Sequence, residues 1–306
     1  MKRHVSVLTQ EVQDGIARSP DATIVDCTFG SGGHAAALIR TLDHRGTYLG
    51  IDVDQSALDA AQDLTKSPAT VRFVCDNFRN IAAILAREAL TPTAILADLG
   101  WRSEQFEEGS KGFSFKHDEP LVMTFGDPEH YPFTAHDIAN VWEEESIADI
   151  VFGYGEERFA RRIARNIVAA REEGEIKTSG QLAEIVTRAV PAPFRHGRIH
   201  PATKTFQAFR IAVNDELGAL KQLLTDGFEA LEDGGRLAII SFHSLEDRIV
   251  KQYFSVLAHD QRAQVITKKP ITASDEEQSA NPRARSAKLR ILEKIEHYDE
   301  STSTRN

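Results

Sequence analysis

The chain has 306 residues, 41% of them apolar and 27% charged, a composition that indicates an ordinary globular protein of one or two domains. No apolar run approaches the ~20 residues of a membrane span, and the N-terminal apolar stretch is too short for a signal peptide, so we expect a cytoplasmic protein in which Cys27 and Cys75 are reduced thiols rather than metal ligands. The net charge of −10 disfavours a uniformly basic nucleic-acid-binding domain, although basic residues do gather in local clusters.

The first hundred residues alternate between strand and helix patterns. The expected strands are 22–27, 46–51, 71–75 and 94–99, and the expected helices between them are 33–42, 56–66 and 81–90. Ser56 is the expected cap of the second helix. Regular alternation of this kind predicts a parallel sheet with right-handed crossovers, which is the doubly wound α/β fold.

The alternation stops after Gly100 and resumes near residue 236. Residues 101–135 show no clear periodicity, helical patterns cover 136–190, and one long helix is expected from 203 to 231. The later expected elements are a strand at 236–242, a helix at 244–257 that opens like a capping box, and strands at 263–268 and 287–295.

The simplest organisation is one α/β domain interrupted by a mostly helical insertion. We predict that residues 1–103 and 201–300 form the α/β domain and that residues 104–200 form the insertion. The tail at 301–306 is expected to be disordered.

Residues suited to ligand binding follow each of the first four strands, at the carboxyl ends where open α/β sheets bind ligands. They are the Gly-rich turn 26–34, Asp52, the segment 75–78 and Asp98. Glycines let the backbone approach a ligand, and a carboxylate after the second strand is typical of a ribose contact. The turn lacks the dinucleotide fingerprint G-x-G-x-x-G because residue 35 is Ala, and the chain has no P-loop. We therefore predict an adenosine-type cofactor.

Single residues at this edge also have structural interpretations. Asp26 could simply anchor the turn, and His34 could be a surface residue of the first helical turn. Asp54 fits a helix cap better than a ligand.

The segment Asp26-Cys-Thr-Phe-Gly-Ser-Gly-Gly-His34 resembles the opening motif of the bacterial small-subunit rRNA (cytosine-N4)-methyltransferases, the MraW/RsmH family. The resemblance extends from about residue 4 to residue 295. Further matching motifs are Gly112–Phe115, Tyr154–Ala164, His200–Ala208, Ile240–Lys251 and Asn281–Arg290.

The resemblance implies a class I, Rossmann-like methyltransferase fold with an inserted helical domain that recognises the substrate. It also implies S-adenosylmethionine as methyl donor and, as target, a cytidine in the decoding region of 16S rRNA in the small ribosomal subunit. The cofactor contacts of the family fall on Gly32, Gly33, His34, Asp52, Phe78, Asp98 and Gln105.

Two segments depart from the family pattern. Where the family usually has D-L-G-V-S-S-P-Q, this chain has Asp98-Leu-Gly-Trp-Arg-Ser-Glu-Gln105. Where the family usually has P-L-D-M-R-M-D, Val122 and Thr124 replace the aspartate and the arginine. These departures leave the catalytic efficiency and the exact target open. Trp101 and Arg102 could compensate for the replaced residues, the ring by stacking on a base and the cation by contacting the RNA backbone.

Methylation of the cytosine amine requires in-line alignment and an acceptor for an N–H proton. Asp98 and His243 are the candidate acceptors. Asp98 could instead hold the cofactor, as the resemblance favours, and His243 could be a structural residue of a capped turn.

RNA contacts are expected from arginines and lysines that bind the phosphate backbone. The candidates are Arg162, Arg165, Arg198, Lys204, Arg283 and Arg285, and the first two belong to a basic stripe on a helix whose apolar stripe contains Ile163 and Ile167. The alternative for each is a solvated position or an internal ion pair.

Two other functions stay open. One is a related methyltransferase with a shifted target, and the other is a ribosome-associated protein that binds the cofactor with little or no catalysis. The sequence also leaves open whether the chain forms a homodimer.

Overall fold

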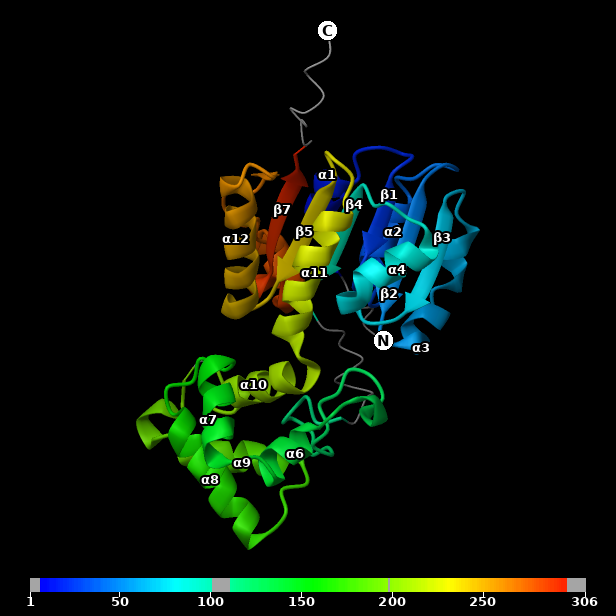
Figure 1. Cartoon of the computed structure of the whole chain (residues 1–306). Helices are drawn as coiled ribbons and strands as arrows, with labels where there is room; N and C mark the ends of the chain where they lie inside the picture. The colour runs from blue at the N-terminus through cyan, green and yellow to red at the C-terminus, as the bar shows by residue number, and fades with distance from the viewer. Residues whose placement is uncertain (1–5, 101–110, 198, 296–306) are drawn as a thin grey trace. The chain divides into compact units, whose positions relative to one another are not determined.

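The computed structural model describes residues 6–100, 111–197 and 199–295. The chain divides into two compact units, one formed by 1–102 together with 218–306 and the other by 103–217 (Figure 1). Within the described ranges, no helix is long and apolar enough to cross a membrane.

The first unit is built on a seven-stranded sheet with the order β3-β2-β1-β4-β5-β7-β6. The strands are β1 (Thr23–Asp26), β2 (Thr47–Asp52), β3 (Thr70–Cys75), β4 (Ala94–Asp98), β5 (Arg236–Ser241), β6 (Ala263–Val265) and β7 (Lys288–Lys294). The first five run parallel, and β7 pairs antiparallel with both β5 and β6. The strand order reverses direction at β1, which confirms the predicted doubly wound α/β fold.

Helices cover both faces of this sheet. The helices are α1 (Thr9–Ile16), α2 (Gly33–Ile39), α3 (Gln55–Asp59), α4 (Ile81–Glu88), α11 (Glu216–Ala230), α12 (Ser244–His259) and α13 (Asp275–Ala280), with 3₁₀ turns η1 (Gln62–Lys66), η2 (Phe78–Asn80) and η5 (Pro282–Ser286). Apolar residues of α1, α2 and α3 pack on one face, and those of α4, α11 and α12 pack on the other. Consecutive strand residues alternate between the two layers, as Ile24 and Val25 do, so both must be apolar.

The second unit is helical. Its elements are η3 (Pro128–His130), α6 (Ala135–Asn140), α7 (Glu144–Gly153), α8 (Ala160–Glu173), α9 (Ser179–Ala189), η4 (Ala192–Phe194) and α10 (Thr203–Asn214). On α8 the predicted apolar stripe is confirmed, because Ile163 and Ile167 are completely buried. Arg162 and Arg165 on the same helix are exposed, as the basic stripe predicted.

Four predicted features are corrected by the structure. The long helix expected at 203–231 is two helices, because Asp215 takes a left-handed conformation with φ 45° between α10 and α11. The helical unit accordingly includes α10 and extends to residue 217, whereas the sequence placed the end of the insertion at 200. Asp54 caps α3, since its carboxylate accepts the Ser56 N–H. The prediction that Asp54 is a helix cap is confirmed, and the prediction that Ser56 caps this helix is wrong. The expected strand 263–268 pairs only as far as Val265.

Candidate functional site

The Gly-rich turn joins β1 to α2 in a conformation that requires glycine. Gly32 has φ 75°, and a Cβ there would lie 2.9 Å from the Phe29 ring. A Cβ on Gly33 would lie 2.1 Å from Ser6 Oγ. Ser6 belongs to the N-terminal segment, which is fixed where the Leu8 N–H donates to Glu277 Oε1 of α13 at 2.8 Å. The tight turn predicted from the glycines is confirmed.

Asp26 anchors this turn from inside the core. Its Oδ1 accepts the Thr28 N–H at 3.1 Å, and its Oδ2 accepts the hydroxyl of Tyr48 at 2.7 Å. Asp26 and Tyr48 are both buried, and this burial raises the pKa of the Asp26 carboxyl despite its hydrogen bonds. The structural interpretation of Asp26 is therefore confirmed.

Asp52 ends β2 and connects two of the predicted elements. Its Oδ2 accepts the Gly30 N–H of the Gly-rich turn at 2.8 Å, and its Oδ1 accepts the Asp54 N–H at 3.0 Å. The carboxylate is only partly buried, so it also faces the edge of the sheet. Phe78, after β3, begins η2 and packs partly buried against the apolar layer that contains α4.

Asp98 ends β4 and lies beside His34. The Asp98 N–H donates to Thr28 Oγ1 at 2.6 Å, and Asp98 Oδ1 accepts the Gly100 N–H at 2.9 Å. Asp98 Oδ2 lies 3.4 Å from Nε2 of His34. The first and fourth predicted elements are therefore joined through both backbone and side chains.

His34 is 5% exposed, so the alternative of a surface histidine is wrong. Burial by itself lowers the pKa of this imidazole, but the interaction with the nearby Asp98 carboxylate, together with the charges of Asp26 and Glu277, outweighs it and raises the pKa. Neither ring nitrogen of His34 has a hydrogen-bond partner of good geometry among the described residues, and Nε2 faces Asp98 as an ion pair. The side chain thus faces Asp98.

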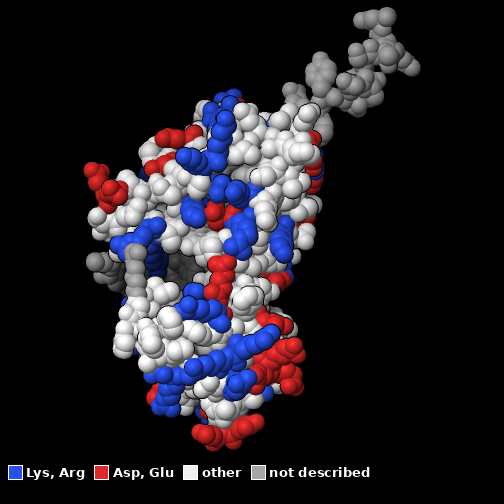
Figure 2. Space-filling view, turned by 90° about the vertical axis from the view of Figure 1, so that its left-hand side faces the viewer, with Lys and Arg blue, Asp and Glu red and all other residues white. Residues whose placement is uncertain are grey.

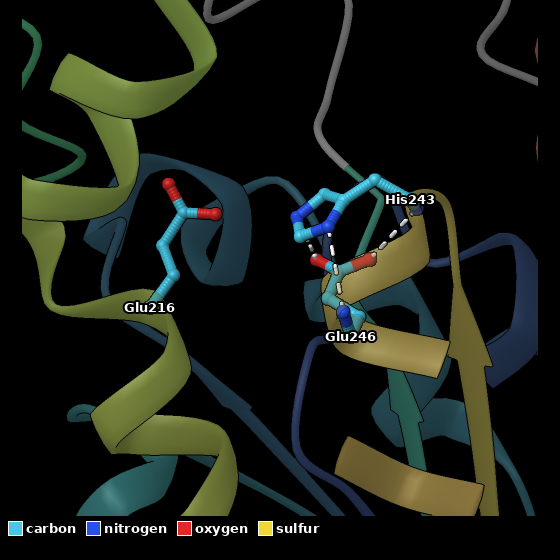
Figure 3. Close-up of side chains that lie close together, drawn as sticks. All are labelled: Glu216, His243 and Glu246. Carbon is cyan, nitrogen blue, oxygen red and sulfur yellow. Dashed lines mark hydrogen bonds and ion pairs between the residues drawn. The ribbon is translucent and has the colours of Figure 1, made fainter. Parts of the chain in front are cut away.

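His243 caps the N-terminus of α12 through its interaction with Glu246 (Figure 3). Glu246 Oε2 accepts the N–H groups of Phe242 at 2.8 Å and His243 at 3.2 Å. The Glu246 N–H donates to His243 Nδ1 at 3.4 Å, and His243 Nε2 lies 3.1 Å from Glu246 Oε1. Both ring nitrogens thus face Glu246, which supports the structural interpretation of His243.

Glu216, the third residue labelled in Figure 3, belongs to the helical unit. Its carboxylate accepts two hydrogen bonds from Arg210, at 2.6 and 2.9 Å.

The candidate RNA-binding residues differ in their availability. Arg162 is exposed, and Arg165 is exposed with its Nε 3.7 Å from Glu144 Oε1. Lys204 donates to the backbone oxygen of Glu156 at 2.8 Å, which favours a structural role within the protein over a contact with RNA. On the first unit, Arg283 is partly buried and Arg285 is exposed, both in η5.

Surface charge is unevenly distributed. Figure 2 shows Lys and Arg side chains in a band across the lower, helical unit, with Asp and Glu in separate clusters at its margin. The predicted residues Gln105 and Arg198, and the unusual Trp101 and Arg102, lie outside the described residues.

The unusual segment around residue 124 lies inside the helical unit. Thr124 is completely buried, and its hydroxyl donates to the backbone oxygen of Gly126 at 2.9 Å. The next residue is held by Asn214, whose Oδ1 accepts the Phe125 N–H at 2.9 Å. At this position the family's arginine is therefore replaced by a small polar residue that satisfies its own hydrogen bond.

Sequence reasoning missed Tyr48, Glu246 and Phe194. Tyr48 lies in an apolar strand and gives no local sign of its bond to Asp26, 22 residues away. Glu246 lies in the predicted capping box, but the cap is His243, one residue earlier than the pattern suggested. Phe194 lies in a Pro-rich segment without periodicity, although its exposed ring contacts a guanidinium.

Comparison with known proteins gives consistent matches over the whole chain. Residues 1–295 match the model of the MraW methylase family. The ribosomal RNA small subunit methyltransferase H of Symbiobacterium thermophilum is 45% identical, over 97% of this chain and 98% of that protein. The protein of the same name from Brevibacillus brevis is 44% identical, over 95% and 98%. A solved structure of a putative rRNA methylase from Clostridium thermocellum aligns with a TM-score of 0.44 and 12% identity, covering 94% of each chain.

Proposed function

The chain belongs to the MraW methylase family and is an S-adenosylmethionine-dependent rRNA methyltransferase, and from this premise we propose that it methylates N4 of a cytidine in the decoding region of 16S rRNA. The reaction would take place on the small ribosomal subunit in the cytoplasm. Light scattering of the purified protein measures whether a homodimer forms.

One observation supports the cofactor site most directly. The carboxylates of Asp52 and Asp98 lie at the same edge of a parallel sheet. The Asp52 carboxylate accepts the Gly30 N–H of the Gly-rich turn, and the Asp98 backbone N–H donates to Thr28 Oγ1 of the same turn. Carboxylates suit a ligand that carries ribose hydroxyls and positive charge. We assign the cofactor contacts to Gly32, Gly33, His34, Asp52, Phe78 and Asp98, with Gln105 from outside the described residues. When bound, S-adenosylmethionine supplies an electrophilic methyl group.

The protein's task in the reaction is to align the cytosine amine and to accept its proton. Asp98 fits this better than His243, because Asp98 is hydrogen-bonded to the Gly-rich turn of the cofactor site, whereas Nδ1 of His243 accepts the Glu246 N–H of its own helix cap. A carboxylate oxygen can accept more than one hydrogen bond, so Asp98 can accept from a substrate N–H although its Oδ1 already accepts the Gly100 N–H. The Asp98→Asn variant should therefore lose methyl transfer by a larger factor than it loses cofactor affinity.

We assign substrate recognition to the helical unit. The exposed Arg162 and Arg165 on α8 are its candidate phosphate contacts, and Arg285 is a candidate on the first unit. Charge reversal at Arg162 and Arg165 should lower rRNA affinity and the slope of its salt dependence, and it should leave cofactor affinity unchanged.

The test is nucleoside mass spectrometry on small-subunit rRNA from cells with and without the gene, repeated with purified protein and subunits that lack the mark. Loss of N4-methylcytidine, restored by the purified protein, is the expected result. Loss of a different methylated nucleoside would indicate a shifted target. No change in any nucleoside would indicate a cofactor-binding protein without turnover.

A further inference from the structure

A cluster of one cation and two aromatic rings lies on the helical unit. The Arg158 guanidinium carbon is 4.6 Å from the ring centroid of Phe159 and 4.0 Å from that of Phe194. The two rings are 5.4 Å apart and tilted by 44°. Phe159 precedes α8, and Phe194 ends η4, so two separate segments supply the cluster.

The Phe194 ring is partly exposed to solvent and belongs to a turn that is fixed by hydrogen bonds. It is 50% exposed, although it contacts both Arg158 and Phe159. The turn begins with Pro191 and is fixed by Arg195, which donates from Nε to the Val190 oxygen at 2.7 Å. An aromatic ring that is fixed in place but half exposed offers a flat surface to a partner at little cost in entropy.

The charge around the cluster favours a polyanionic partner. Arg158, Arg161 and Arg162 are all exposed, and none of them has an ion-pair partner among the residues that the structure describes. The nearest acid in sequence, Glu157, is buried, and its Oε1 accepts the Phe159 N–H at 2.9 Å. The guanidinium groups are therefore available to phosphates, beside a ring that an unpaired base could stack on.

We propose that Arg158, Phe159 and Phe194 form a stacking platform for one unpaired base of the rRNA substrate, and that Arg161 and Arg162 bind the adjacent phosphates. This inference rests on the proposed function, because it takes rRNA as the ligand. It also specifies how the helical unit would bind single-stranded RNA. A base stacks on one face of the Phe194 ring, and the Arg158 guanidinium packs against the other face.

The experiment is filter binding of 16S rRNA stripped of ribosomal proteins, at several salt concentrations, with wild type and four variants. Phe194→Ala should bind about 5- to 150-fold more weakly, as expected for the loss of one stacked base. Phe194→Tyr should bind within about 2-fold of wild type, because it keeps the ring. Neither change removes a charge, so both should keep the wild-type salt slope, whereas Arg161→Gln should reduce that slope by ~0.7 for the loss of one phosphate contact with a single strand.

Phe152→Ala is the matched control, because Phe152 is also exposed, at 67%, and has no ring or guanidinium contact among the described residues. An affinity of Phe194→Ala equal to wild type, or an equal loss in Phe152→Ala, would refute the platform. A loss seen only with intact subunits would assign Phe194 to a ribosomal protein and would also refute it. Failure of the wild type itself to bind or methylate rRNA would instead refute the proposed function.

Discussion

The ion pair between His34 and Asp98 should make the stability of the first unit depend on pH. The pKa of His34 is raised above 6.5 in the folded protein, so its contribution is fully present below pH 6.5 and is lost as pH rises through the folded pKa. A hydrogen bond to a charged group contributes about 1.5–3 kcal/mol. The 3.4 Å separation is long for such a bond, so we expect about 1–2 kcal/mol.

The test replaces His34 by Gln, which has a similar length but never carries a charge. Urea unfolding of wild type and His34→Gln should be compared between pH 5.5 and 9. At the acid end of this range the wild type should be more stable than His34→Gln, and this difference in the free energy of unfolding should shrink as pH rises. The exposed His44→Gln serves as the control and should show no such trend. A difference between wild type and His34→Gln that stays constant over this range would refute the assignment of a charged His34.

Three further predictions concern single residues. Asp52→Asn should weaken S-adenosylmethionine binding by about 1.5–3 kcal/mol in calorimetry, and a folded variant with unchanged affinity would exclude Asp52 as a contact. Gly32→Ala should lower the free energy of unfolding by about 1–3 kcal/mol, because it combines a left-handed φ with a clash against Phe29, and it should exceed the effect of Gly234→Ala, where φ is 77° but the space is open. Thr124→Arg should destabilise the helical unit by about 3 kcal/mol or more in thermal unfolding, since it places a cation at a completely buried position; wild-type stability would mean that this side chain can reach water.

The sheet and the position of its ligand edge were predictable from the sequence for a physical reason. Strands buried on both faces appear as continuous apolar runs, and parallel strands must bring their carboxyl ends to one edge. Asp52 and Asp98 were therefore expected close to the Gly-rich turn, and in the structure both residues are hydrogen-bonded to it. Their contacts with the cofactor stay predictions.

Other features depend on contacts that no local pattern shows. The bond between Tyr48 and Asp26 forms only when β1 and β2 pair. The break at Asp215 puts a non-glycine residue in a left-handed conformation, which the apolar spacing of the two helices does not reveal. Histidine is not among the usual N-cap residues, so the cap at His243 was expected one residue later. The burial of Thr124 could not be foreseen because the segment around it has no periodicity.

The bond from Leu8 to Glu277 has a consequence for how the chain is synthesised. The two residues are separated by 269 positions, and at ~5–20 residues per second a ribosome needs about 15–50 s to add them. During that time Glu277 is not yet synthesised, so the segment that carries Ser6 lacks the hydrogen bond that fixes it beside Gly33. We therefore expect the Gly-rich turn of the cofactor site to complete its folding only near the end of translation. Chains released before Glu277 is added should lack the folded turn.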